Sequence, residues 1–75
     1  MEYSEDQDQV AEYMRLAIPL MTQNGVLMTP DNYAVWYEYA SGRNAALTTK
    51  IDELLQQEKG ITQQQSKELY QQFFD

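Results

Sequence analysis

The segment 28–42 constrains the fold more than any other part of the chain. It carries signals for both ends of a helix: Thr29 can cap the start, Pro30 suits the first helical position, and Gly42 suits the left-handed residue after the last turn. Only two residues between these ends are charged. A helix this apolar on every side needs other helices around it. We therefore expect this segment to form the central helix of the domain.

The segment before it has the periodicity of a second helix. Ser4 and Gln7 form a capping box that would start this helix, and Asn24-Gly25 would stop it. Pro19 lies inside the segment, so its ring should kink the helix or end it. We expect the N-terminal half to lie on the surface and the C-terminal half to be buried. The apolar residues at helical spacing are Val10, Tyr13, Met14, Ala17, Ile18 and Met21.

Two further helices are expected after the central one. Asn44 is placed to cap a helix over about 45–58, and Thr62 with Gln65 forms a capping box for the last helix. The apolar face of the first comprises Leu47, Ile51, Leu54 and Leu55. The apolar face of the second comprises Leu69, Tyr70, Phe73 and Phe74. Four helices with short connections predict neighbours that pack roughly antiparallel.

The fold class follows from this pattern. No stretch of the chain alternates with the two-residue period of a β-strand. We therefore expect an all-α protein, a compact bundle of about four helices in which the first helix is kinked at Pro19. At 75 residues the chain is long enough for one domain only, so residues 1–75 are assigned to a single helical domain.

The composition excludes several classes of site. With no cysteine and no histidine, the chain can form no disulfide, no histidine- or cysteine-based zinc site and no catalytic triad of the Ser-His-Asp or Cys-His kind. A net charge of −7 repels phosphate and anionic lipid, so we expect neither a nucleic-acid nor a membrane partner. The longest apolar run, 16–21, is too short to span a bilayer, and the acidic start is unlike a signal peptide. We expect a cytoplasmic protein.

Acidic residues are the remaining candidates for chemistry. Asp52 and Glu53 are adjacent on a helix, so their side chains point apart and cannot form a close catalytic pair. An acidic group at the N-terminus lacks the glycine and the spaced oxygen ligands of a calcium loop, so we interpret it as a solvated helix start. That group comprises Glu2, Glu5, Asp6 and Asp8. We expect no catalytic residue, no metal ligand and no cofactor site in this segment.

The central helix offers a candidate ligand site. Its aromatic residues can line a small-ligand pocket, but the same spacing also packs a core, and we favour the core. Asn32 lies in the first turn, where it can cap the helix, bridge loops or contact a ligand. The residues that form either a pocket or a core are Asn32, Tyr33, Trp36 and Tyr37.

The last helix provides a second candidate site. Adjacent phenylalanines point in different directions, so Phe73 and Phe74 should not both face one small core. We expect one of them to face a partner chain or a continuing domain. No helix-stop signal precedes Asp75, so we expect the helix to continue past it. The candidate interface or linker residues are Tyr70, Phe73 and Phe74.

The central helix also contains the run Pro30-x-Asn32-Tyr33-x-x-Trp36-Tyr37, followed by Ser41-Gly42. Together with the other matching segments, this run resembles the N-terminal helical region of a group of bacterial diguanylate cyclases. The similarity covers about residues 10–75, and its most specific part is the run in the central helix. The other matching parts are Ala17 to Met21, Arg43-Asn44, Leu47, Ile51 to Leu55, Ile61-Thr62, Leu69-Tyr70 and Phe73-Phe74.

The resemblance implies a non-catalytic regulatory or dimerisation module in cyclic di-GMP signalling. In those proteins this region precedes a GGDEF domain, which condenses two GTP molecules with magnesium, and no part of this chain matches the catalytic motif. The implied partners are a cyclase domain that follows in the same chain and a second copy in a homodimer. GTP and magnesium would bind only in that following domain, so this segment would be truncated before it and would not be an enzyme.

Two alternatives stay open at this point. The first is a helical sensor that binds a small ligand with the aromatic residues of the central helix. The second is a stand-alone acidic adaptor that binds a basic partner protein, because the chain carries a strong excess of acidic residues. Pocket volume separates the first alternative from the regulatory module, because a closed core around Trp36 would contradict a ligand site there. A reading frame that ends at Asp75 would contradict the regulatory module and leave the second alternative.

Overall fold

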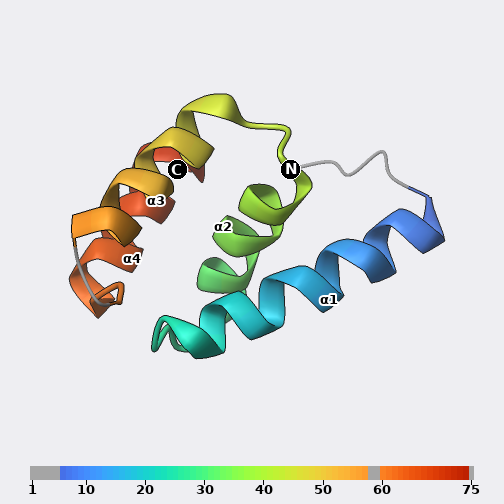
Figure 1. Ribbon diagram of the computed structural model, residues 1–75, viewed down its shortest axis with the longest axis horizontal. Coiled ribbons are helices and arrows are strands. Elements are labelled where there is room, and N and C mark those ends of the chain that lie inside the picture. The colour runs from blue at the N-terminus through green and yellow to red at the C-terminus, as the bar shows by residue number, and fades with distance from the viewer. Residues whose placement is uncertain (1–5, 58–59, 75) are drawn as a thin grey trace.

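The computed structural model describes residues 6–57 and 60–74, which form four helices (Figure 1). They are α1 (Gln7–Gln23), α2 (Pro30–Ser41), α3 (Ala45–Gln57) and α4 (Gln63–Phe74). The described residues contain no strand, so the expected all-α bundle of about four helices is confirmed. Figure 1 shows α2 between α1 on one side and the pair α3 and α4 on the other. None of the described helices is long and apolar enough to cross a membrane.

The limits of α2 agree with the signals in its sequence. Thr29 is the N-cap, and its Oγ1 accepts a hydrogen bond from the backbone N–H of Asn32 at 3.2 Å. Pro30 occupies the first helical position, and Gly42 ends the helix with φ at 72°. This helix contacts α1, α3 and α4. The prediction that it is the central helix is therefore confirmed.

The start of α1 differs from the prediction. Asp6, not Ser4, is the N-cap, and it forms a capping box with Gln9. The Gln9 N–H donates to Oδ1 of Asp6 at 2.9 Å, and the Asp6 N–H donates to Oε1 of Gln9 at 3.0 Å. Aspartate caps a helix as well as serine does, and here it also has a glutamine three residues later. Ser4 itself lies outside the described residues, as do Glu2 and Glu5.

The helix α1 continues through Pro19 and reaches its C-cap at Asn24. Of the two outcomes expected at Pro19, termination is therefore wrong. Proline provides no N–H for the carbonyl oxygen of Arg15, one turn earlier. Both Pro19 and Arg15 are exposed, so water can satisfy that oxygen and the helix can tolerate the proline.

Fewer side chains in the second half of α1 are buried than expected. Ala17 and Met21 are fully buried, whereas Leu16 is 45% exposed and Ile18 is 41% exposed. The reason is the position of α1 at the outside of the bundle, where it packs mainly along α2 (Figure 1). A helix with one main neighbour buries one face only, so apolar residues on its other faces remain in contact with solvent.

Every helix contributes to one core, and two loop residues complete it. Its largest fully buried side chains are Trp36, Met21, Leu47, Ile51, Leu69 and Val35. Val26 and Ile61 add side chains from the loops before α2 and α4. The two loops are joined directly, because the Ile61 N–H donates to the carbonyl oxygen of Asn24 at 3.1 Å. Gly60 permits this approach, since a Cβ there would lie 3.0 Å from the same oxygen.

The caps of α3 and α4 agree with prediction. Oδ1 of Asn44 accepts a hydrogen bond from the Leu47 N–H at 3.0 Å. Thr62 and Gln65 form the expected capping box, with two hydrogen bonds of 2.9 and 3.0 Å. Glu58, the expected last residue of the third helix, lies outside the described residues.

Candidate functional site

The aromatic residues of α2 divide between the core and a groove. Trp36 is 1% exposed and belongs to the core, where its ring meets Tyr39 edge-on at 5.4 Å between centroids. A side chain enclosed in this way cannot contact a ligand unless the bundle opens. The tryptophan is therefore a packing residue, and among the expected pocket residues the two tyrosines Tyr33 and Tyr37 are the ones that line a groove.

That groove runs between α1 and α2 and has a volume of about 460 Å³. Its walls are almost entirely apolar, and they comprise Val10, Met14, Pro30, Tyr33, Ala34 and Tyr37. Tyr37 packs edge-on against Tyr13 of α1 at 5.6 Å and lies 6.0 Å from Tyr33. Burial raises the pKa of Tyr33 above its usual 10.0, so its hydroxyl ionises less readily than that of an exposed tyrosine. The groove can accept an apolar surface or ligand, but it lacks a charged side chain to perform chemistry.

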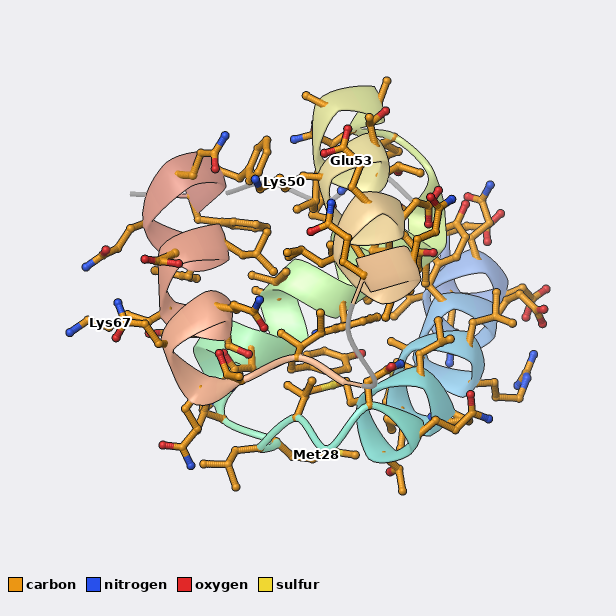
Figure 2. All side chains as sticks on the ribbon, turned by 60° about the vertical axis from the view of Figure 1, so that its left-hand side comes forward. Met28, Lys50, Glu53 and Lys67 are labelled. Atoms are coloured by element: carbon orange, nitrogen blue, oxygen red, sulfur yellow. The ribbon has the colours of Figure 1, made fainter. Side chains whose placement is uncertain are left out.

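Asn32 supports the start of α2 and does not face the groove. Its side-chain amide donates to the carbonyl oxygen of Leu27 at 3.0 Å, which ties the loop before α2 to the first turn of the helix. It also borders a more polar hollow between α2 and α4 that includes Lys67 and Tyr70. Figure 2 shows Lys67 pointing away from the bundle. Of the roles expected for Asn32, bridging a loop is the one that the hydrogen bonds support.

The C-terminal aromatic residues are half-buried and pack against the core. Phe73 borders a hollow beside α3 that it shares with Lys50, and Figure 2 shows Lys50 reaching from α3 toward α4. Phe74 stacks on Tyr70, with ring centroids 5.4 Å apart and the planes 6° from parallel. The expectation that both phenylalanines could not contact one core is therefore wrong. One lies toward α3 and the other lies along its own helix, so both reach the edge of the core.

Two polar contacts between side chains were missed by the sequence analysis. The hydroxyl of Tyr39 donates to Oδ1 of Asp52 at 2.6 Å and so joins α2 to α3. Burial, this hydrogen bond and the nearby negative charge raise the pKa of Tyr39 to about 12. Glu38 is buried and forms an ion pair with Arg43, just after α2. Glu38 is the only charged residue of α2 after Asp31 in its first turn, and this was the available signal for that pair.

Acidic residues do not gather into a site in the part of the chain that the structure describes. No group of three or more acidic side chains there could hold a metal ion. Asp52 is engaged with Tyr39, and Glu53 is exposed on α3, where Figure 2 shows it on the outside of the bundle. The two carboxylates therefore have different surroundings, as their adjacent positions on a helix predict.

The most distinctive feature of the surface is apolar. Large hydrophobic side chains remain more than 40% exposed on α1 and in the loop before α2; they are Met14, Leu16, Ile18, Leu27 and Met28. Figure 2 shows Met28 in that loop, at the outer edge of the molecule. Exposed apolar groups that lie close together often mark a contact surface for another protein. Met14 lines the groove between α1 and α2, and together with Ile18 it borders a separate hollow on the surface of α1.

No protein-family model, curated protein or solved structure matched this chain. The fold and the surface therefore define the class of protein by themselves. It is a small all-α domain with a hydrophobic core around Trp36, an apolar groove between its first two helices and exposed hydrophobic side chains on α1 and in the loop before α2.

Proposed function

We propose that this domain is a non-catalytic regulatory and dimerisation module that controls a diguanylate cyclase domain following it in the same chain. One observation carries the proposal: the run that resembles the cyclase family coincides with α2, the helix that contacts the other three. Pro30 starts this helix, Asn32 ties the preceding loop to it, and Trp36 fills the core. Proteins that share a fold would retain residues that start a helix, hold a loop or fill the core.

The chemistry of the cyclase explains how a helical module can regulate it. Two cyclase domains, each with one GTP, must face each other before the two nucleotides can be joined. A module that sets the distance and angle between two protomers can allow or prevent that encounter. The half-buried residues Tyr70, Phe73 and Phe74 lie on the last helix, next to the point where such a domain would follow, so they are the residues proposed to transmit the change.

Two experiments test this function. The sequence after Asp75 in the same reading frame should encode a GGDEF domain, and a stop codon there would contradict the proposal. The protein that contains both parts should then be assayed for cyclic di-GMP with residues 1–75 intact, deleted, or replaced by an unrelated monomeric helical domain. We expect the deletion and the replacement to change the rate to the same extent, and an unchanged rate in both would refute regulation by this module.

The groove between α1 and α2 favours a second candidate function, a sensor for an apolar small molecule. Its volume and its apolar walls are suited to such a ligand. Binding would be detected by a rise in the midpoint of thermal unfolding with ligand concentration. A substitution inside the groove, Ala34→Leu, should abolish that rise, whereas Ala46→Leu, on α3 and outside the groove, should leave it unchanged.

A further inference from the structure

The turn that ends α1 contains the pair Asn24-Gly25. Asparagine is among the chemically labile residues, because its amide carbon can be attacked by the backbone nitrogen of the next residue. A glycine in that next position leaves the nitrogen unhindered, since it has no side chain. Gly25 is exposed, and a Cβ placed on it would meet nothing within 4 Å, so the surface there is open to water. The pair therefore combines a reactive amide with an accessible nucleophile.

The reaction of such a pair balances without a cofactor or an oxidant. The Gly25 nitrogen gives up its proton and forms a bond to Cγ of Asn24, the bond from Cγ to Nδ2 breaks, and ammonia leaves with that proton. Water then opens the cyclic imide at one of its carbonyl carbons. One opening gives aspartate, and the other gives isoaspartate, in which the main chain runs through the side-chain carbons. Overall, one amide and one water become one carboxylate and one ammonium ion.

The folded backbone keeps the two reacting atoms apart. The ψ angle of Asn24 is 9°. A ψ near zero eclipses the nitrogens of Asn24 and Gly25 about the Cα–C bond, and Cβ of Asn24 is then roughly a third of a turn away. Ring closure requires Cβ and the Gly25 nitrogen to be eclipsed instead, so the Cα–C bond must first rotate by about that amount.

Three hydrogen bonds oppose this rotation. The carbonyl oxygen of Asn24 turns with the Cα–C bond, and it accepts the Ile61 N–H at 3.1 Å from the loop before α4. The Gly25 N–H donates to the carbonyl oxygen of Thr22 at 3.2 Å. The leaving group, Nδ2 of Asn24, donates to the carbonyl oxygen of Leu20 at 2.9 Å. The contact between Asn24 and Ile61 therefore has to open before the ring can close.

The products cannot restore these contacts. A carboxylate has no N–H to donate to the carbonyl oxygen of Leu20. Its negative charge also lies at the C-terminal end of α1, which is the negative end of the helix dipole. In the isoaspartate form the main chain is longer by one carbon at the point that joins α1 to the loop. Modification therefore weakens the same contact that had prevented it.

We propose that Asn24 is a site of spontaneous deamidation in this chain, and that its contact with Ile61 is the gate that sets the rate. The closed contact keeps the site unreactive, and each modification leaves the contact weakened in a way that does not reverse. This inference goes beyond the proposed function and does not rest on it. It concerns the chemistry of residues 6–74 alone, so the sequence that follows Asp75 does not affect it.

The site is tested by incubation of the 75-residue chain at neutral pH, with and without a denaturing concentration of urea. Trypsin releases the peptide 16–43, in which tandem mass spectrometry locates the exchange of an amide for a carboxylate. We expect this exchange at Asn24 to be at least about tenfold faster in the unfolded chain. Asn32, in the same peptide, is the internal control, because the side chain of Tyr33 hinders the attacking nitrogen. Faster exchange at Asn32, or equal rates at Asn24 in both states, would overturn the proposal.

The gate is tested by a matched pair of variants. In Gly60→Ala a Cβ would lie 3.0 Å from the carbonyl oxygen of Asn24, so the folded variant should deamidate at least about threefold faster than the wild type. Tyr39→Phe weakens the contact between α2 and α3 instead, and its rate should stay within about twofold of the wild type. Equal acceleration in the two variants would show that only global unfolding exposes the site.

The wild-type chain provides a test of the gate that needs no variant. At urea concentrations below the unfolding transition, deamidation at Asn24 and hydrogen exchange at the Ile61 amide should accelerate by the same factor, because one opening permits both. Faster exchange at Ile61 with an unchanged rate at Asn24 would overturn the gate.

The effect of the modification is tested with Asn24→Asp, which reproduces the aspartate product. Hydrogen exchange at the Ile61 amide should be at least about threefold faster in this variant than in the wild type. Gln23→Glu adds the same charge one residue earlier and keeps the bond from the Asn24 amide to Leu20, so its effect should be smaller. Exchange in Asn24→Asp that is as slow as in the wild type would contradict the weakening of the contact.

Discussion

The hydroxyl of Tyr39 donates a 2.6 Å hydrogen bond to Oδ1 of Asp52, and this contact joins α2 to α3 across thirteen positions of the chain. The bond is charge-assisted and part-buried, so it is stronger than a bond between two exposed neutral groups. It adds a polar link between α3 and the central helix, whose other contacts are made by packed side chains.

Removal of this hydroxyl should destabilise the fold. We expect Tyr39→Phe to lower the free energy of unfolding by about 1–2 kcal/mol, because Asp52 loses a donor while the aromatic ring is retained. Urea denaturation followed by circular dichroism measures this. Tyr33→Phe is the matched control on the same helix, and it should cost less, since its hydroxyl bonds to no side chain among the described residues. An equal loss in both variants would contradict the role of the Tyr39–Asp52 bond.

The same residue predicts a dependence on pH. The pKa of Tyr39 is raised from 10.0 to about 12 in the folded protein, first by burial and then by Asp52. The folded state therefore holds this proton more tightly than the unfolded state. The resulting stability is fully present below pH 10 and is lost as the pH rises from 10 to about 12. The loss over this range, measured by urea denaturation, should be smaller in Tyr39→Phe than in the wild type.

Trp36 distinguishes a core residue from a ligand-binding residue. Because its side chain is 1% exposed, we expect Trp36→Ala to cost about 3–5 kcal/mol, which can unfold a domain of this size. Tyr33→Ala, at the groove, should cost clearly less, since Tyr33 is only partly buried. Thermal unfolding of both variants measures the difference. A stable, cooperatively folding Trp36→Ala variant would show that the tryptophan is not needed for the core.

Gly60 controls the contact between two loops. A Cβ at this position would lie 3.0 Å from the carbonyl oxygen of Asn24, which also accepts the Ile61 N–H. We expect Gly60→Ala to destabilise the domain by about 1–3 kcal/mol and to speed hydrogen exchange at the Ile61 amide. Gly42→Asn is the matched control, because the space around Gly42 is open and asparagine tolerates its left-handed backbone. Slow exchange at Ile61 in Gly60→Ala would contradict the prediction.

The helix limits that could be predicted depend on short-range contacts. The caps at Thr29, Asn44 and Thr62 each bond to a backbone N–H three residues later, so the atoms that decide them are close in sequence. The error at the start of α1 is of the same kind. Two nearby residues, Ser4 and Asp6, satisfy the same capping rule, and a local rule cannot choose between them.

The parts of the candidate site that could not be predicted depend on long-range packing. Periodicity indicated that α1 has an apolar face, but it could not show that α2 is the main neighbour of this helix. That single neighbour leaves Leu16 and Ile18 exposed and creates the groove with Tyr33 and Tyr37. The Tyr39–Asp52 bond was missed because Asp52 lies on the face of α3 that its sequence assigns to solvent.

The sequence by itself determined the all-α class, the number of helices, the caps of three of them and the central place of the helix that contains Trp36. These features follow from backbone hydrogen bonding and from apolar residues repeated within one helix. The tertiary structure decided which of those apolar side chains are buried in the core and which are exposed on the surface. That choice depends on how many neighbours each helix has, and α1, with one main neighbour, retains exposed apolar side chains such as Met14 and Ile18.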